Sequence, residues 1–177
     1  YKCCTTFDSS PTVGSLGTAI GLLRHNVRNA FVPVVGGQPS LGRYCAFGNL
    51  FATAGSEGAV HRIDRHPTMS RHPVTPMAEA DLRRHLALQG LAKIALIDTR
   101  TISGADDDAL EAAIASALAD EPDAVLFDAM QQDDLARIGG VIWRHALRKP
   151  LLALGASSVA QALLAHWRAC GELPAAD

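Results

Sequence analysis

The sequence lacks an apolar run long enough to span a bilayer, because its longest apolar stretches, such as residues 151–154, are only a few residues long. It also lacks an excess of basic charge: 16 Lys and Arg residues stand against 18 Asp and Glu residues, which gives a formal net charge of −2. The basic residues are scattered rather than massed, which argues against a nucleic-acid surface. We therefore predict no membrane and no nucleic acid among the partners of this chain.

Paired-cysteine motifs are absent as well. Cysteines occur at positions 3, 4, 45 and 170, and no C-x-x-C pair is present. This pattern is typical of buried free thiols in a reducing compartment, so we predict a cytoplasmic location. An initiator Met is also missing, because the chain begins at Tyr1. We expect the chain to be part of a longer protein.

The sequence does contain enough apolar residues, 48% of 177, to build the core of one domain. In its second half, short apolar runs at 93–98, 124–127 and 151–154 alternate with three segments of helical spacing. Those segments are marked by Leu110, Ile114 and Leu118, by Leu135, Ile138, Ile142 and Leu147, and by Val159, Leu163 and Trp167. The alternation predicts an α/β fold with a parallel, Rossmann-like sheet and helices on both faces.

The first half is less regular. Residues 4–7 and 31–35 have the composition of strands, and a helical run lies between them. Residues 36–77 have no clean period and are rich in Gly, Pro, His and Arg, which predicts a long irregular functional loop. We expect this loop to end at Thr75, a good N-cap, with Pro76 in the first helical position and helix over 81–88.

Polar residues follow the predicted strands, where open parallel α/β sheets bind their ligands. Asp8, Gln38, Asp98 and Asp128 each come directly after a strand or within a few residues of one, so we expect them to converge on one crevice. Thr6, Asp8 and Ser10 place two hydroxyl groups and a carboxylate at a strand-to-helix turn, which can bind the hydroxyl groups of a substrate. The alternative is a well-capped turn with nothing bound.

A second group of polar residues lies in the irregular segment. Three Arg and two His residues fall within residues 62–72, and both His residues precede Pro, which favours an extended backbone. Arg65, His66 and His72 can hold a carboxylate through charge and hydrogen bonds. The alternative is a solvated basic loop, or a loop at a homodimer interface. Because the spacing of His61, His66 and His72 fits no common metal motif, we predict no metal site.

The histidines on predicted helices have polar neighbours in the sequence. They are His25, His85, His145 and His166. We interpret them as surface residues.

Several motifs in order along the chain resemble one known family. They are Cys4-Thr5-Thr6-Phe7-Asp8-Ser9-Ser10-Pro11 with Gly14-Ser15-Leu16-Gly17, Leu41-Gly42-Arg43-Tyr44 with Gly48-Asn49-Leu50-Phe51, His72-Pro73-Val74-Thr75-Pro76-Met77, Asp128-Ala129 with Asp133-Asp134-Leu135, and Gly155-Ala156-Ser157-Ser158. Together they are similar to the N-terminal substrate-binding domain of the four-carbon acid sugar kinases, which include threonate, erythronate and 3-oxo-tetronate kinases.

The resemblance implies a function and a domain organisation. Residues 1–177 would be a partial N-terminal sugar-acid-binding domain, without the family's opening Asp-Asp-x-Thr-Gly-Ala strand and without its C-terminal ATP-binding domain. The full-length enzyme would use ATP and Mg²⁺ to phosphorylate the terminal hydroxyl of a threonate-like acid. The fragment alone would bind neither cofactor and would be inactive.

The resemblance also suggests roles for the candidate residues. Arg65 and His72, supported by Arg43 and His66, would hold the substrate carboxylate, and Thr6, Asp8 and Ser10 would bind its hydroxyl groups. No residue is assigned as the general base. Two alternative functions stay open at this point: a non-catalytic sugar-acid binding or sensing module, and an isomerase or aldolase that acts on hydroxy acids.

Overall fold

A computed structural model describes residues 2–55 and 58–173 of the chain. It contains a five-stranded sheet in the order β1-β8-β2-β7-β6, in which every neighbouring pair is parallel. A second, three-stranded sheet in the order β3-β4-β5 is antiparallel. The predicted α/β class with a parallel sheet is therefore confirmed.

The elements have the following bounds. The parallel sheet consists of β1 (Lys2–Cys4), β2 (Pro33–Val35), β6 (Ile94–Ile97), β7 (Ala124–Phe127) and β8 (Ala153–Gly155). The antiparallel sheet consists of β3 (Arg43–Ala46), β4 (Asn49–Thr53) and β5 (Val60–Arg62). The α-helices are α1 (Leu16–Arg24), α2 (Leu82–Ala87), α3 (Thr99–Gly104), α4 (Asp107–Ala119), α5 (Gln132–Arg148) and α6 (Ser158–Ala169), and the 3-10 helices are η1 (Pro39–Leu41), η2 (Ile63–Arg65) and η3 (Met69–Arg71).

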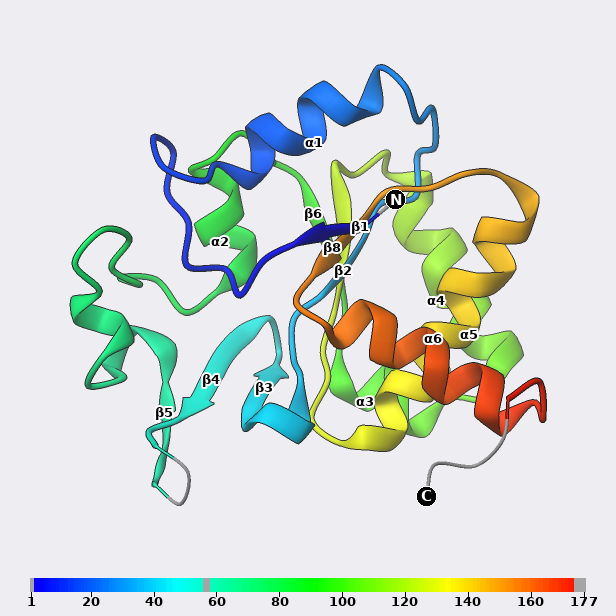
Figure 1. Cartoon of the computed structure of the whole chain (residues 1–177). Coiled ribbons are helices and arrows are strands. Elements are labelled where there is room, and N and C mark those ends of the chain that lie inside the picture. The colour runs from blue at the N-terminus through cyan, green and yellow to red at the C-terminus, as the bar shows by residue number, and fades with distance from the viewer. Residues whose placement is uncertain (1, 56–57, 174–177) are drawn as a thin grey trace.

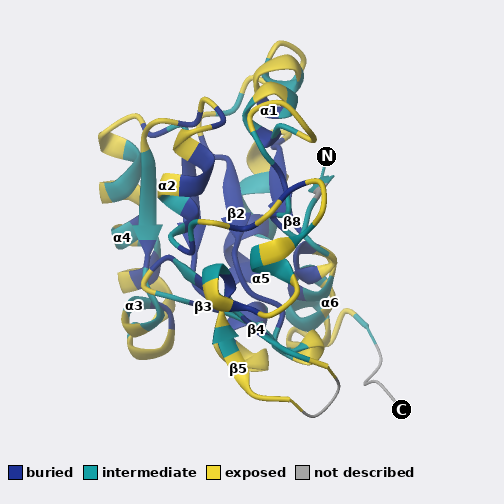
Figure 2. Ribbon diagram, turned by 90° about the vertical axis from the view of Figure 1, so that its left-hand side faces the viewer, coloured by how far each residue is buried: buried dark blue, intermediate teal, exposed yellow. Residues whose placement is uncertain are grey.

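Helices cover both faces of the parallel sheet, with α1 and α2 on one side and α3 to α6 on the other (Figure 1). Strand β7 contributes side chains to the cores on both faces of the sheet, because successive side chains of a strand point in opposite directions. Leu126 belongs to the core under α1 and α2, and Phe127 belongs to the core under the other helices. The central strands are accordingly buried on both sides (Figure 2), which explains their continuous apolar sequences.

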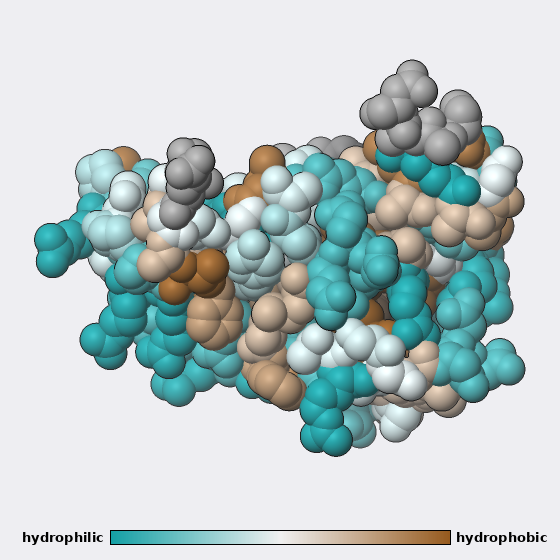
Figure 3. Space-filling view, turned by 90° about the horizontal axis from the view of Figure 1, so that it is seen from below, coloured by the Kyte–Doolittle hydropathy of each residue, from teal (hydrophilic) through white to brown (hydrophobic). Residues whose placement is uncertain are grey.

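The antiparallel sheet lies at the carboxyl edge of the parallel sheet. Cys45 of β3 and Ala129 after β7 exchange two backbone hydrogen bonds, with N···O distances of 3.0 and 3.1 Å. The parallel strands run towards the lower side of the molecule in Figure 1, and the surface on that side is mainly hydrophilic with smaller apolar patches (Figure 3). Ligands of such sheets bind at this edge.

The long irregular loop that we expected over residues 36–77 is not confirmed, since β3, β4, β5 and three 3-10 helices lie within it. Strands β3 and β4 are joined by a tight turn in which Phe47 and Gly48 have φ values of 50° and 80°. A turn with two positive φ values suits the twist of a hairpin, but Phe is an unusual residue in its first central position. The sequence signal for this hairpin is therefore weak.

Two expected boundaries are wrong. The helix expected over 81–88 is confirmed as α2, but it begins after Asp81, which caps it by accepting a hydrogen bond from the Arg83 N–H at 2.9 Å, and not after Thr75. Thr75 instead donates its N–H to His72 Nδ1 at 3.1 Å. Strand β1 ends at Cys4 and does not extend to Phe7, whose φ of 69° lies outside the range of strands. Among the helices of the described residues, none has the length and apolar character needed to cross a membrane.

Candidate functional site

The carboxyl ends of β1, β2 and β8 surround a small pocket, which we call the strand-end pocket. Its free space is about 10 Å³, close to what one water-sized group requires. It is lined by Thr6, Gly36, Gly37, Gln38, Arg43 and Ser158, together with Phe7, Val35, Leu50 and Ala156. Two of the residues predicted from the sequence, Thr6 and Arg43, thus lie together at the sheet edge.

The loop after β1, residues 5–15, is held by its own hydroxyl groups, and we call it the Asp8 loop. Thr6 Oγ1 donates a hydrogen bond to Asp8 Oδ1. Ser10 Oγ accepts the Val13 N–H at 2.9 Å and so stabilises the turn that leads towards α1. Thr6 and Asp8 are therefore joined as a pair, whereas Ser10 has a local structural contact and its binding role stays a prediction.

Arg43 brings a positive charge to the strand-end pocket from the start of β3. Its Nη1 donates to the Thr6 carbonyl oxygen at 3.4 Å. Burial lowers the pKa of the Arg43 guanidinium, and the nearby Asp8 carboxylate acts in the opposite direction. A guanidinium remains charged in proteins and can hold a carboxylate through two parallel hydrogen bonds. Arg43 thus presents at this edge a group of the kind that binds carboxylates.

Two buried polar atoms in the strand-end pocket lack a partner among the described residues. Gln38 is 2% exposed and Ser158 is 1% exposed, yet Gln38 Oε1 and Ser158 Oγ make no hydrogen bond. The other amide atom of Gln38 is engaged, because its Nε2 donates to Ser157 Oγ at 2.6 Å. Buried polar atoms are normally paired. The pocket therefore offers hydrogen bonds to a small polar group.

The amino end of α6 adds to this arrangement. Ser157 is the N-cap of this helix, and its side chain makes no capping hydrogen bond. Helix N-termini present free N–H groups and a positive dipole, which favour a negatively charged group nearby. The strand pattern predicts the place of Gln38 at this edge, and the family resemblance includes Ser157-Ser158. A pair of Ser residues is equally typical of a plain N-cap, so the sequence does not indicate its contact with Gln38.

Arg65, His66 and His72 lie in η2, η3 and the residues that flank them. In the part of the chain that the structure describes, their hydrogen bonds and ion pairs stay within residues 53–75. Arg65 pairs with Asp64 at 3.8 Å and is largely exposed. His66 Nδ1 accepts the Met69 N–H at 3.1 Å. The structure thus links none of the three to the strand-end pocket, and their substrate contacts stay a prediction.

Two further strand-end carboxylates have structural partners. Asp98 caps α3 by accepting the Thr101 N–H at 2.9 Å. Asp128 is fully buried and accepts three backbone N–H groups, from Phe47 at 2.5 Å, Gly48 at 2.9 Å and Thr99 at 3.0 Å. The expected convergence of strand-end residues is therefore partial, since these two carboxylates hold the backbone.

His85 on α2 is buried, with 7% of its surface exposed, so the expectation of a surface residue is wrong for it. Burial lowers the pKa of the His85 imidazole below its ordinary value of 6.5. Its Nε2 lies 3.3 Å from Ser9 Oγ and 3.0 Å from Gln89 Nε2. Among the described residues, no group of three or more His, Cys, Asp or Glu side chains is placed to hold a metal ion.

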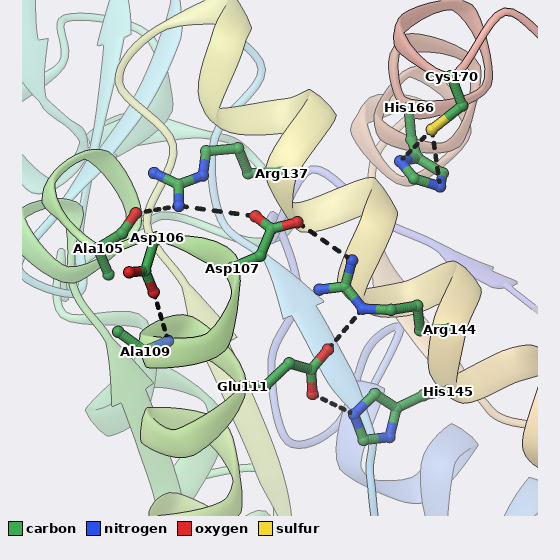
Figure 4. Close-up of polar contacts among 10 residues, drawn as sticks. All are labelled: Ala105, Asp106, Asp107, Ala109, Glu111, Arg137, Arg144, His145, His166 and Cys170. Atoms are coloured by element: carbon green, nitrogen blue, oxygen red, sulfur yellow. Dashed lines mark hydrogen bonds and ion pairs between the residues drawn. The ribbon is translucent and has the colours of Figure 1, made fainter.

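A larger and more open depression lies between α4 and α5, with a volume of about 590 Å³. Three of the charged side chains that line it, Asp107, Glu111 and Arg144, are paired with each other (Figure 4). Arg144 Nε donates to Glu111 Oε1 at 2.8 Å, and Arg144 Nη1 lies 3.6 Å from Asp107 Oδ2. Burial acts to raise the pKa of the Glu111 carboxyl, but Arg144 and His145 hold it below its ordinary value. Compensated charge makes this depression a weaker candidate than the strand-end pocket.

Comparison with known proteins was made on the sequence and on the structure. Residues 1–163 match the family model described as "Sugar-binding N-terminal domain". The chain is 45% identical over 174 residues to the 3-oxo-isoapionate kinase of Paraburkholderia graminis, covering 98% of this chain and 36% of the relative. It is 34% identical over 170 residues to the 3-oxo-tetronate kinase of Methylobacterium radiotolerans, covering 95% of this chain and 37% of the relative.

Solved structures show the same fold. A Salmonella typhimurium LT2 protein superposes with a TM-score of 0.80 at 25% identity, over 96% of this chain and 37% of that one. A Bordetella bronchiseptica protein, solved with bound citrate as a domain swapped dimer, superposes with a TM-score of 0.63 at 21% identity, over 93% of this chain and 36% of that one. The chain spans just over a third of the length of the relatives it matches.

Proposed function

This chain belongs to the family of sugar-binding N-terminal domains, and on that basis we propose that it binds a small sugar acid in the strand-end pocket. In this proposal it is the substrate-binding part of a cytoplasmic, ATP-dependent kinase for four-carbon acid sugars. The names of the relatives support a 3-oxo acid as substrate. A threonate-like acid is the substrate that the sequence resemblance implies. The names of the relatives favour a kinase over a sensing module, an isomerase or an aldolase.

One observation carries the proposal: a half-buried cation and unpaired polar atoms meet in the same pocket. A small sugar acid has one carboxylate and several hydroxyl groups. Arg43 supplies charge for the carboxylate, while Gln38 and Ser158 have free hydrogen-bonding capacity for a hydroxyl group. Because the pocket admits only one water-sized group, we place a hydroxyl group of the ligand inside it. The carboxylate would lie at its rim against Arg43, and the rest of the ligand would extend over the Thr6–Asp8 pair.

The proposed chemistry needs positioning more than covalent catalysis. A substrate hydroxyl oxygen forms a bond to the γ-phosphorus of ATP, the bond from that phosphorus to the β–γ bridging oxygen breaks, and ADP leaves. The hydroxyl proton passes to a base that we do not assign to a residue of this chain. ATP and Mg²⁺ would bind to the remainder of the longer protein, and this domain would orient the hydroxyl.

Binding to the strand-end pocket can be measured by calorimetry with threonate, erythronate and 3-oxo-tetronate. We expect Arg43→Met to weaken the affinity for the acid by about tenfold or more, because a charge-assisted hydrogen bond contributes roughly 1.5–3 kcal/mol. Arg43→Lys keeps the charge but loses the planar fork, so an intermediate loss is expected. Binding of none of the acids by the unsubstituted chain would contradict the proposal.

The same measurement decides between the two possible carboxylate anchors. Arg65→Ala and His72→Ala test the anchor predicted from the sequence, and Arg43→Met tests the one in the strand-end pocket. If the ligand lies in the strand-end pocket alone, the first two variants keep the affinity of the unsubstituted chain. A loss of affinity in Arg65→Ala or His72→Ala with none in Arg43→Met would show that the carboxylate binds at η2 and η3 and not in the strand-end pocket.

A further inference from the structure

Three buried polar side chains lie beneath the Asp8 loop, and we call them the Ser9–His85–Gln89 cluster. Ser9 comes from the loop, and His85 and Gln89 come from α2 and the residues that follow it. Their exposed fractions are 4%, 7% and 6%. Polar groups buried this deeply need partners. Their hydrogen-bond partners therefore indicate which nitrogen and oxygen atoms of the cluster carry protons.

The orientation of the Gln89 amide follows from one contact. Gln89 Oε1 accepts the Leu16 N–H at 2.9 Å, at the start of α1. A backbone N–H only donates, so this atom of the amide has to be the oxygen. The other atom, Nε2, is then a donor, and it lies 2.9 Å from Ser9 Oγ and 3.0 Å from His85 Nε2. Gln89 thus connects α1, α2 and the Asp8 loop.

The amide donor of Gln89 indicates the protonation state of the His85 imidazole. A hydrogen bond from Gln89 Nε2 to His85 Nε2, which lie 3.0 Å apart, requires a lone pair on that ring nitrogen. His85 is then neutral, with its proton on Nδ1. Protonation of Nε2 would place two donors 3.0 Å apart inside the protein. Ser9 Oγ would then be the acceptor for both, and the hydrogen bond between Gln89 and His85 would be lost, which costs free energy.

The loop above the cluster has a strained backbone. Phe7 has a φ of 69°, a value that bulky residues rarely adopt, and its side chain is 2% exposed. Its carbonyl oxygen accepts the Ser9 N–H at 2.8 Å, and Ser9 Oγ lies 3.3 Å from the same oxygen. Strained residues persist when their surroundings hold them. Here the surroundings are Ser9 and, through it, the two side chains of the cluster.

We propose that His85 and Gln89 are positioning residues of the sugar-acid site, which hold the strained Phe7 turn through Ser9 and so place Thr6 and Asp8 at the strand-end pocket, and that they do so only while His85 is neutral. This inference rests on the proposed function, because the affected property is the binding of a sugar acid. Neither residue touches the pocket directly, so both act through the loop.

The charges around His85 determine the direction of its pH dependence. Burial lowers the pKa of its imidazole, while the Phe7 carbonyl and the carboxylate of Glu79 act to raise it. Glu79 is itself paired with Arg84 at 3.1 Å. The Asp8 loop and the residues that follow α2 face the ring with the neutral groups of Ser9 and Gln89.

Since the folded-state pKa of His85 lies below the unfolded value, its contribution to stability is complete above pH 6.5. That contribution is lost as the pH falls through the folded pKa, because the unfolded chain then binds more protons than the folded one. Binding of the acid should weaken over the same range of pH.

The protonation state can be tested without any ligand. Nitrogen-detected NMR of the histidine rings in the chain should show His85 with its proton on Nδ1 at pH 7.5 and still neutral somewhat below pH 6.5. His25, the exposed C-cap residue of α1, provides an exposed imidazole for comparison within the same sample. A proton on His85 Nε2 at pH 7.5, or titration of His85 at or above pH 6.5, overturns the proposal.

The positioning role is tested with Gln89→Glu. A carboxylate still accepts the Leu16 N–H, but it cannot donate to His85 and instead stabilises the protonated ring. We expect the pH at which affinity for the acid is lost to move upwards by about one unit or more, in step with the pKa of His85 measured by NMR. Gln132→Glu, at an exposed position of α5, is the matched control and should leave the profile unchanged.

His85→Gln provides a second test in case Gln89→Glu does not fold. Its amide can accept from Gln89 but never takes up a proton, so affinity should become independent of pH between about 5 and 7.5. An unaltered pH profile in both variants overturns the positioning role. If the unsubstituted chain binds no sugar acid, the proposed function fails and the positioning role fails with it, while the NMR measurement still decides whether the neutral cluster exists.

Discussion

Asp128 illustrates how a strand-end carboxylate can serve the backbone instead of a ligand. It follows β7 at the edge where ligands bind, yet its two oxygens are occupied by N–H groups of Phe47, Gly48 and Thr99. Those groups belong to the turn between β3 and β4 and to the start of α3. One side chain thus fixes the antiparallel sheet against the parallel one.

We expect Asp128→Asn to destabilise the chain by at least about 2 kcal/mol, because the amide loses charge and turns a donor towards backbone donors. Asp120→Asn, at an exposed position, should change the free energy of unfolding by less than about 0.5 kcal/mol. Urea unfolding followed by circular dichroism measures both variants. Equal midpoints for the two would show that the Asp128 contacts contribute little.

Sequence reasoning located residues at this edge better than it assigned their roles. Placement of Asp8, Gln38 and Asp128 after strands needed only the strand pattern, and the structure puts all three there. The roles depend on partners that are distant in sequence: Asp128 binds N–H groups about 80 residues earlier, and Gln38 contacts Ser157 across 119 residues. The order of residue types along the sequence does not indicate which distant residues contact each other, so these contacts could not be predicted from it.

At the scale of elements, α5 and α6 pack closely because α5 carries a glycine at the contact. A Cβ atom on Gly139 would lie 1.9 Å from the Ala162 carbonyl oxygen of α6. No side chain fits at that distance, so the two helices would have to separate. By contrast, a Cβ atom on Gly21, in the exposed part of α1, would meet no other atom within 4 Å.

These two glycines give opposite expectations for the same substitution. Gly139→Ala should destabilise the chain by about 1–3 kcal/mol through overpacking. Gly21→Ala should stabilise it by about 0.5–1 kcal/mol, since alanine loses less conformational entropy in a helix. Thermal unfolding of both variants tests the pair, and a Gly139→Ala variant as stable as the unsubstituted chain would disprove the close contact.

Elements with a strong period were predicted well, and the others were not. Strands β6 and β7 and helices α4, α5 and α6 lie where apolar runs and helical spacing placed them. The hairpin of β3 and β4 was missed because its turn uses Phe47 where Asn or Asp is typical. The start of α2 was misplaced because Thr75 and Pro76 imitate a helix start, while Thr75 is engaged with His72.

At the scale of the whole molecule, we propose that this chain binds the acid and that the rest of the longer protein binds ATP. This can be tested with the chain alone. Because ATP and Mg²⁺ are proposed to bind elsewhere in the longer protein, we expect the 177-residue chain to bind a sugar acid without releasing ADP from added ATP. Calorimetry measures the binding, and a coupled ADP assay measures the transfer. ADP release that depends on the acid would show that this chain also holds the nucleotide.

The alternation of strands and helices predicted the parallel sheet, but the order β1-β8-β2-β7-β6 could not be predicted in the same way. Short-range rules set the direction and burial of each strand. The position of β8 between β1 and β2 depends instead on which apolar faces fit together. Fold class was thus available from the sequence, and topology required the structure.

The pairing of β1 with β8 joins the two ends of the described chain. Lys2 Nζ donates to the Ala156 carbonyl oxygen across a sequence separation of 154 residues. Closing so long a loop costs entropy before any contact repays it, so this pairing should form late during folding. The strand-end pocket needs the residues that follow β1 together with those that follow β8. A chain emerging from the ribosome would therefore build its central strands before it acquired any affinity for a sugar acid, and a ligand would stabilise only molecules that had completed that last pairing.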